Sequence, residues 1–284
     1  MNEINRFIDI SNEIGSDVAF VQAGGGNTSV KLSTKEMLIK SSGIYLKDMT
    51  PNSGFCNVNF PEIKKYHYNL IDDEEKYSQK LNESVIKGVG RPSMETGFHA
   101  LIPHKYVIHS HPVYLNVLLC SNKGEDMTSS IFNYFNWVST TAPGKYLSLE
   151  ILRILDQKQQ LKDVEIFFLE NHGLIISSND PGLCLRQHQS ISKEVLKSLK
   201  LEKFNFTKFC NMEDEFDGMA LFPDQAVFSS LESSNSIAFR ENFAAANYIL
   251  DQIKKLNLKP KFLDKDLINY LQGMPSEKYR SSLN

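Results

Sequence analysis

The chain has 284 residues, of which 41% are hydrophobic and 23% are charged, and its formal net charge is -3. This balance suits a globular core and excludes the basic surface that nucleic-acid binding requires. The four cysteines, at positions 56, 120, 184 and 210, form no Cys-x-x-Cys pair, which predicts reduced thiols rather than disulfides or a thiolate cluster. The sequence begins without the basic and apolar regions of a signal peptide, and no apolar run reaches about 18 residues. We therefore expect a soluble, cytoplasmic protein that binds neither nucleic acid nor membrane.

Short helices and strands are predicted in the first part of the chain. Apolar residues near helical spacing predict a helix over 4–15. Two β-prone stretches, 28–32 and 36–39, predict a hairpin that follows a glycine-rich loop. Further helices are predicted over 72–87, where apolar residues share one face, and over 94–102, which stops before a proline.

Two apolar strands follow, at 105–111 and 164–169. Helices are predicted around them, over 113–120, 146–155 and 183–199. Helices that alternate with strands in this way indicate an α/β or α+β protein in which helices cover a sheet.

The composition becomes more polar from about residue 203, where a loop over 211–218 precedes an apolar cluster at 219–228 and two predicted helices. We therefore expect a main domain at 1–205 and a C-terminal extension at 206–284 that packs on the same domain.

Three histidines stand at the ends of predicted strands. His109 and His111 point to one face of the strand 105–111, because side chains two residues apart in a strand lie on the same side. His172 follows the second apolar strand, and Gly173 behind it permits close backbone approach. Three histidines with an open position are typical of a catalytic zinc site. Spacing alone does not separate this hypothesis from a chance histidine pair in a half-buried strand.

Three polar segments carry further candidate chemistry. The segment 24–29, Gly-Gly-Gly-Asn-Thr-Ser, suits phosphate oxygens, although a tight turn before a hairpin explains the same residues. The segment 40–44, Lys-Ser-Ser-Gly-Ile, fits a phosphate or carboxylate, or an ordinary polar turn. In the segment 91–95, Arg-Pro-Ser-Met-Glu, Ser93 lies near the start of a predicted helix. Glu95 can carry chemistry or simply interact with the helix dipole.

These motifs together resemble the class II aldolase and adducin family, particularly the aldolase half of rhamnulose-1-phosphate aldolase/dehydrogenase fusion proteins. They occur in the family's order over about residues 15–200. Segments 142–144, 222–225 and 273–280 add matches to the fusion-type branch. The resemblance implies the three-layer fold of class II aldolases, in which a central, mostly antiparallel sheet is flanked by helices. The main domain would then be the catalytic one.

The resemblance also implies residue roles. The ligands of a divalent metal, Zn2+ or else Mn2+ or Co2+, would be His109, His111 and His172. Glu95 would be the catalytic residue that transfers a proton. The substrate phosphate would be held by Asn27, Ser42, Gly43 and Ser93, with Lys40 as a weaker candidate. One departure is Met94, which stands where small-sugar-phosphate aldolases often have a second serine, so phosphate affinity or substrate size can differ.

The implied activity is that of a metal-dependent aldolase. It would reversibly cleave a phosphorylated ketose to dihydroxyacetone phosphate and an aldehyde, through an enediolate that the metal stabilises. A tyrosine, often from a neighbouring subunit, protonates the other fragment in this family, and Tyr114 and Tyr134 are candidates. The resemblance further implies a homo-oligomer, a tetramer in many members. The alternatives are an epimerase or decarboxylase of a sugar (acid) phosphate, and a non-catalytic adducin-like interaction module, which the three retained histidines disfavour.

Overall fold

A central eight-stranded sheet organises the protein. The computed structural model describes residues 2–68, 73–88, 90–228 and 236–283. The strands lie in the order β4-β3-β2-β1-β5-β8-β7-β6, and all neighbours are antiparallel except the parallel pair β6 and β7. Their bounds are β1 (Asn27–Lys31), β2 (Glu36–Lys40), β3 (Phe55–Asn59), β4 (Val85–Gly88), β5 (Tyr106–Ser110), β6 (Asn136–Val138), β7 (Val164–Leu169) and β8 (Gly173–Ser178). The predicted mostly antiparallel sheet is confirmed.

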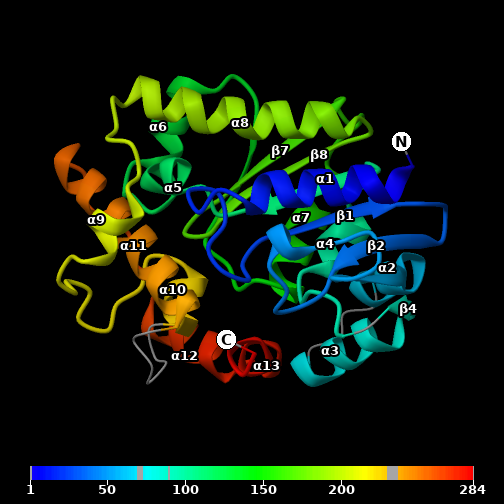
Figure 1. Cartoon of the computed structure of the whole chain (residues 1–284). Helices are drawn as coiled ribbons and strands as arrows, with labels where there is room; N and C mark the ends of the chain where they lie inside the picture. Colours follow the sequence, from blue (N-terminus) through cyan, green and yellow to red (C-terminus); the bar gives the residue numbers. More distant parts are fainter. Residues whose placement is uncertain (1, 69–72, 89, 229–235, 284) are drawn as a thin grey trace.

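Helices cover both faces of this sheet. Those in the first two thirds of the chain are α1 (Glu3–Gly15), α2 (Phe60–Tyr68), α3 (Glu74–Glu83), α4 (Thr96–Leu101), α5 (Val113–Leu119), α6 (Gly124–Ile131), α7 (Lys145–Asp156) and α8 (Pro181–Ser198), with a short 3-10 turn at Leu46–Asp48. Figure 1 shows α1 and α8 side by side along one face of the sheet. The opposite face carries α4 and α7, which pack against each other. The result is the predicted three-layer arrangement.

The two faces are separated by the alternation of side chains along the strands. In β7, Ile166 and Phe168 join the core beneath α1 and α8, whereas Phe167 and Leu169 join the core beneath α4 and α7. Because both faces are covered, β7 reads as a continuous apolar run in the sequence.

The prediction of one helix over 72–87 was wrong at its C-terminal end. Residue 72 lies outside the described residues, and α3 begins at Glu74 and ends at Glu83. The next residues form β4 at the edge of the sheet, where Val85 pairs with Val58 of β3. Val85 and Ile86 are β-branched, which favours a strand, and Ile86 is exposed rather than packed on a helical face.

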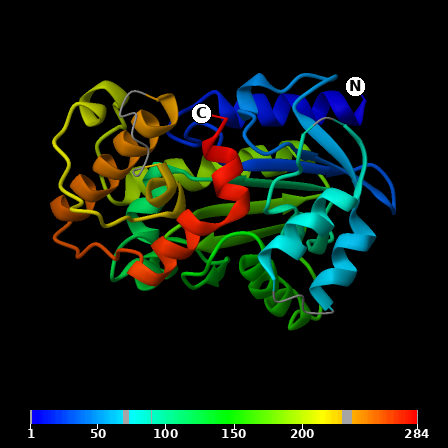
Figure 2. The ribbon, with the colours of Figure 1, turned by 90° about the horizontal axis from the view of Figure 1, so that it is seen from below.

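The C-terminal part of the chain is helical and folds back onto the rest. It contains α9 (Phe206–Cys210), α10 (Pro223–Phe228), α11 (Ile237–Lys255), α12 (Lys265–Gly273) and α13 (Pro275–Ser281). Three described helices thus follow residue 228, where two were expected, because the chain bends at Met274 and Pro275 opens a new helix. In Figure 2, α13 runs across the end of the sheet near α3, with which it makes contact. No helix among the described residues is long and apolar enough to cross a membrane.

Candidate active site

Strand pairing brings the three histidines together at one end of the sheet. Strand β5 lies between β1 and β8, and its register places Ser110 opposite Leu174. His111 directly follows β5 and His172 directly precedes β8, so the two are neighbours across the pair. Gly173 is needed there, because a Cβ on it would lie 2.3 Å from the carbonyl oxygen of Ser110. His109 and His111 thus share a face at the end of β5, as their spacing predicted, and the pairing of β8 with β5 adds His172 to them.

The imidazoles of His109, His111 and His172 form a buried cluster that can hold a divalent ion. One ring nitrogen of each lies within 4.8 Å of the others, and the Nε2 atoms of His109 and His111 are 3.1 Å apart. Tetrahedral ligands at about 2.0–2.1 Å from zinc would lie about 3.3 Å from one another. Burial lowers the pKa of His109 to about 4, and burial together with the other two imidazoles lowers the pKa of His172 well below its usual value. Neutral imidazoles with free lone pairs are the form that binds metal.

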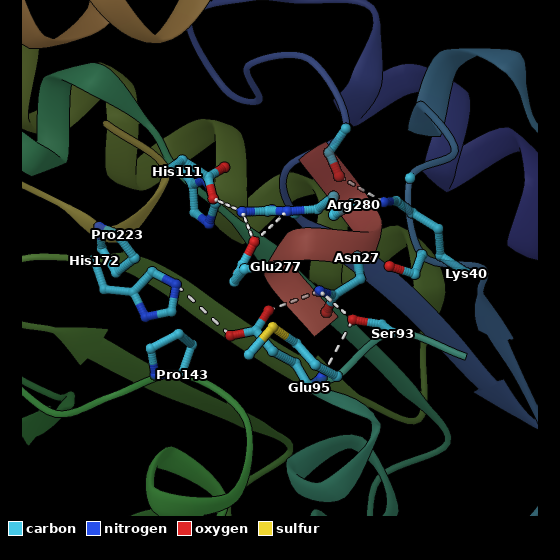
Figure 3. A pocket seen from close by; sticks show the side chains of 16 residues that line it. Asn27, Lys40, Ser93, Glu95, His111, Pro143, His172, Pro223, Glu277 and Arg280 are labelled. Carbon is cyan, nitrogen blue, oxygen red and sulfur yellow. Dashed lines mark hydrogen bonds and ion pairs between the residues drawn. The ribbon is translucent and has the colours of Figure 1, made fainter. Parts of the chain in front are cut away.

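Glu95 faces this cluster from the start of α4. Its Oε2 lies 3.3 Å from Nε2 of His109. Its Oε1 lies 3.6 Å from Nε2 of His172, a contact that Figure 3 shows. The side-chain amide of Asn27 donates to Oε2 at 2.8 Å, and Asn27 itself lies opposite His109 in the β1–β5 register. Among the described residues, no hydrogen bond reaches the buried Oε1. This unsatisfied oxygen faces the clustered histidine nitrogens, an arrangement that suits a bound cation.

The residues that the sequence assigned to substrate line one cavity beside the cluster. Its empty volume is about 440 Å3, and its walls include Asn27, Ser42, Gly43, Ser93 and Glu95, together with His111 and His172. His109 lies beneath them, fully buried. The weaker candidate Lys40 also lines the cavity, where its ammonium donates to the carbonyl oxygen of Gly24 at 2.8 Å. Burial, with help from the nearby Arg280, lowers the pKa of Lys40 to about 7.

A comparison with protein families shows to which one the chain belongs. The model of the class II aldolase and adducin N-terminal domain matches residues 6–193. The chain belongs to this family. Among its relatives, the uncharacterized oxidoreductase YuxG of Bacillus subtilis is 30% identical over 201 residues, which are 67% of this chain. The match spans only 29% of YuxG.

Solved structures of the class II aldolase type share the fold. The N-terminal class II aldolase domain of a conserved protein from Thermoplasma acidophilum aligns with 70% of this chain and 94% of its own, at a TM-score of 0.62 and 24% identity. YgbL of Klebsiella pneumoniae, described as a putative aldolase/epimerase/decarboxylase, aligns with 71% of this chain and 90% of its own, at a TM-score of 0.52 and 15% identity. At these identities the likeness concerns the fold.

Three charged residues in the cavity wall were not predicted as site residues. Asp224 lies in the first turn of α10, and Glu277 and Arg280 lie on α13, all beyond the part of the chain that the family model matches. Their segments had appeared only as sequence matches to the fusion-type branch. His99 of α4 was also missed, although it stands one helical turn after Glu95 and its Nε2 contacts the Oδ1 of Asn27.

The two candidate tyrosines lie away from the cavity. The hydroxyl of Tyr114 accepts a hydrogen bond from the backbone of Phe204, and its ring packs on Tyr248. The hydroxyl of Tyr134 donates to Glu165. Neither tyrosine lines the cavity of its own chain. Met94 does line it, beside Ser93, so the family departure noted in the sequence falls within the site.

Proposed function

We propose that this class II aldolase family member is a metal-dependent aldolase that reversibly cleaves a phosphorylated ketose to dihydroxyacetone phosphate and an aldehyde. The observation that carries the proposal is the three-histidine cluster with Glu95 facing it at the base of a polar cavity. A structural role for the histidines alone would not require a carboxylate within 3.3 Å of His109 in a buried pocket.

His109, His111 and His172 would hold the metal. The ring of His109 supports this assignment, because its Nδ1 contacts the backbone oxygen of Leu174 at 3.0 Å and so turns Nε2 toward the cluster. A divalent ion bound there would supply Lewis-acid chemistry for the carbonyl and hydroxyl oxygens of a ketose. We infer Zn2+ from the all-nitrogen donor set, with Mn2+ or Co2+ as substitutes.

Glu95 would carry the proton in the reaction. When the carbon–carbon bond breaks, the hydroxyl on the aldehyde fragment loses a proton and the carbon of the other fragment gains one. Glu95 is the carboxylate that faces the cluster, and the amide of Asn27 orients one of its oxygens. The second oxygen accepts no hydrogen bond among the described residues, so it can exchange a proton with a ligand.

The phosphate of the substrate would lie against Asn27, Ser42, Gly43 and Ser93. The hydroxyl oxygen of Ser93 accepts from the Asn27 amide at 3.2 Å and from the backbone of Glu95 at 3.3 Å, so its own hydrogen can point to a ligand oxygen. Gly43 has a φ of +80°, a conformation that favours glycine. Because glycine has no side chain, nothing of Gly43 itself covers its backbone. Lys40 adds a positive charge below pH about 7.

The proposal also covers the domain organisation, the cellular location and the oligomeric state. We infer that residues 1–205 form the catalytic domain, that 206–284 form an extension packed on it, and that the protein works in the cytoplasm as a homo-oligomer, a tetramer in keeping with the family resemblance. YuxG is called an oxidoreductase, and the matched 29% of it would correspond to an aldolase part like the one this chain resembles.

The decisive experiment is aldol synthesis. Metal-loaded protein is incubated with dihydroxyacetone phosphate and a panel of aldehydes, and carbon–carbon bond formation is followed by mass. We expect a new phosphorylated ketose with the wild type, and a loss of at least about 100-fold in rate for Glu95→Gln, in line with general acid–base catalysis. Glu165→Gln, at a buried carboxylate that does not line the cavity, is the matched control and should retain the rate.

The products also separate the alternatives. A protein that isomerises a pentulose phosphate or releases carbon dioxide from a sugar acid phosphate, without joining carbon fragments, would be an epimerase or a decarboxylase. Full activity in Glu95→Gln would remove the assigned role of Glu95.

A further inference from the structure

A carboxylate from the C-terminal part of the chain stands behind one of the proposed metal ligands. Asp224 is 4% exposed, and its Oδ2 lies 3.5 Å from Nδ1 of His111. Among the described residues, neither of these two buried atoms has any other hydrogen-bond partner. Two unsatisfied buried atoms of complementary chemistry that face each other indicate a contact that becomes a hydrogen bond with a small shift.

The backbone leaves room for this contact at one glycine. A Cβ on Gly25 would lie 2.6 Å from Oδ2 of Asp224 and 3.1 Å from Nδ1 of His111. The φ of Gly25 is not in the left-handed region, so its conformation alone does not demand glycine. The steric demand comes instead from the approach of Asp224 to His111, together with the nearby carbonyl oxygen of Gln22. The first glycine motif of the sequence therefore has a role besides phosphate binding.

The last helix holds Asp224 in place. Arg280 of α13 donates to Oδ1 of Asp224 at 2.5 Å and to Glu277 at 2.8 Å, and Figure 3 shows its guanidinium beside His111 and Glu277. The ion pair with Arg280 thus fixes one oxygen of Asp224 and leaves the other turned to His111.

We propose that Asp224 is a positioning residue that orients the metal ligand His111, and that Arg280 anchors it from the last helix. The proposal rests on the proposed function, because it takes His111 to be a metal ligand. A carboxylate that accepts the Nδ1 proton fixes the ring orientation, leaves the Nε2 lone pair for the metal and makes that nitrogen a stronger base. His109 receives its corresponding support from a backbone oxygen, so the two neighbouring ligands are fixed in different ways.

The test measures metal affinity directly. The full chain is stripped of metal, and the Kd for Zn2+ is determined by competition with a chromophoric chelator; Co2+ loading reports ligand geometry through its visible absorption. We expect Asp224→Asn to weaken Zn2+ binding about 10- to 100-fold and to change the Co2+ spectrum, as losses of outer-sphere ligand partners do. Arg280→Gln should weaken binding by less, and Arg280→Lys, which keeps the charge, should recover part of that loss.

Glu165→Gln is the matched control. Glu165 forms a buried ion pair with Lys158 at 2.7 Å, as Asp224 does with Arg280, but it lies outside the cavity wall. Thermal unfolding of the metal-free proteins shows the stability lost by each variant. If Glu165→Gln lowers stability as much as Asp224→Asn while its Zn2+ affinity stays within about twofold of wild type, then the affinity loss at Asp224 is due to positioning.

Two results would overturn the inference. The first leaves the aldolase proposal intact, and the second removes it as well. A wild type that binds one metal and makes carbon–carbon bonds, with a Zn2+ Kd unchanged in Asp224→Asn, removes the positioning role only. A wild type that binds no divalent metal removes both. If Asp224→Asn does not fold, the order of Arg280→Lys and Arg280→Gln in Zn2+ affinity decides, and equal affinity to wild type in both refutes the anchoring role.

Discussion

The contact between Asn27 and Glu95 can be tested by one isosteric change. Asn27→Asp replaces the amide nitrogen, 2.8 Å from Oε2 of Glu95, by a carboxylate oxygen. Both side chains are buried, so solvent cannot screen the repulsion between two negative charges at these positions. The pair must either remain doubly charged or share one proton.

Both outcomes lead to a similar loss of stability. Two unit charges about 4 Å apart repel by about 4 kcal/mol at an effective dielectric constant of about 20. Protonating a carboxyl that ordinarily titrates near pH 4 requires about 1.4 kcal/mol per pH unit, or about 4 kcal/mol at pH 7. We therefore expect Asn27→Asp to lower the free energy of unfolding of the metal-free protein by about 4 kcal/mol at pH 7.

The pH dependence gives the sharper signature. Up to about pH 7, protonation costs less than the repulsion of about 4 kcal/mol, so the folded variant holds one proton that the unfolded chain releases above about pH 4. Its stability relative to wild type must therefore fall as pH rises. Between pH 5 and pH 7 the difference between variant and wild type should grow by about 2.7 kcal/mol. Urea unfolding of the two metal-free proteins at both pH values measures it.

The control is a second amide–carboxylate pair in the same chain. Asn57 of β3 donates to Glu36 of β2 at 2.9 Å, but both residues are partly exposed. Solvent screens this pair, so Asn57→Asp should lower stability by less than about 1 kcal/mol and with little change between the two pH values. A loss at Asn27→Asp that is independent of pH, or equal to that at Asn57→Asp, would refute the buried contact that orients Glu95.

Three further predictions concern the cluster and the cavity. Gly173→Ala places a Cβ 2.3 Å from the Ser110 carbonyl oxygen, so we expect a loss of about 1–3 kcal/mol in stability by thermal unfolding and a parallel loss of metal affinity in the competition titration. The KM for a phosphorylated ketose should rise above pH about 7 as Lys40 loses its charge, and a pH series with Lys40→Met should show a higher, flatter KM. Chelation should abolish aldol activity until Zn2+, Mn2+ or Co2+ is restored, and metal at about 100 times its Kd should raise the free energy of unfolding by about 2.7 kcal/mol; activity that survives complete chelation would contradict the metal role.

Local patterns in the sequence predict elements well where one physical cause dominates. The helix 4–15 and the hairpin 28–39 appear as expected, with ends shifted by one residue. The segment 72–87 fails because apolar residues there satisfy two periods at once. Val85 and Ile86 continue the helical spacing of Tyr77 and Leu81, yet they pair as an edge strand once β3 lies beside them. Pairing with a distant strand is a tertiary effect that no local window contains.

The cluster of three histidines could be predicted only in part for the same reason. The shared face of His109 and His111 follows from the two-residue period of a strand. Their meeting with His172 depends on β8 lying between β5 and β7, and β8 was not predicted as a strand at all. Strand order is set by how the layers pack, so the family motifs, rather than periodicity, pointed to the third histidine.

The pair Glu277 and Arg280 is largely buried, whereas its sequence pattern predicts a solvent-exposed pair. A Glu-x-x-Arg pair on a short terminal helix is normally a solvated surface pair that contributes a few tenths of a kcal/mol. Here Glu277 is 2% exposed, and Arg280 also binds Asp224, which lies 56 residues earlier in the chain. Here one guanidinium contacts two buried carboxylates at once. The second carboxylate is within reach because α13 folds back to α10, and the same fold brings Asp224 to His111. The ion pairs of the last helix and the contact between Asp224 and His111 therefore depend on one packing event.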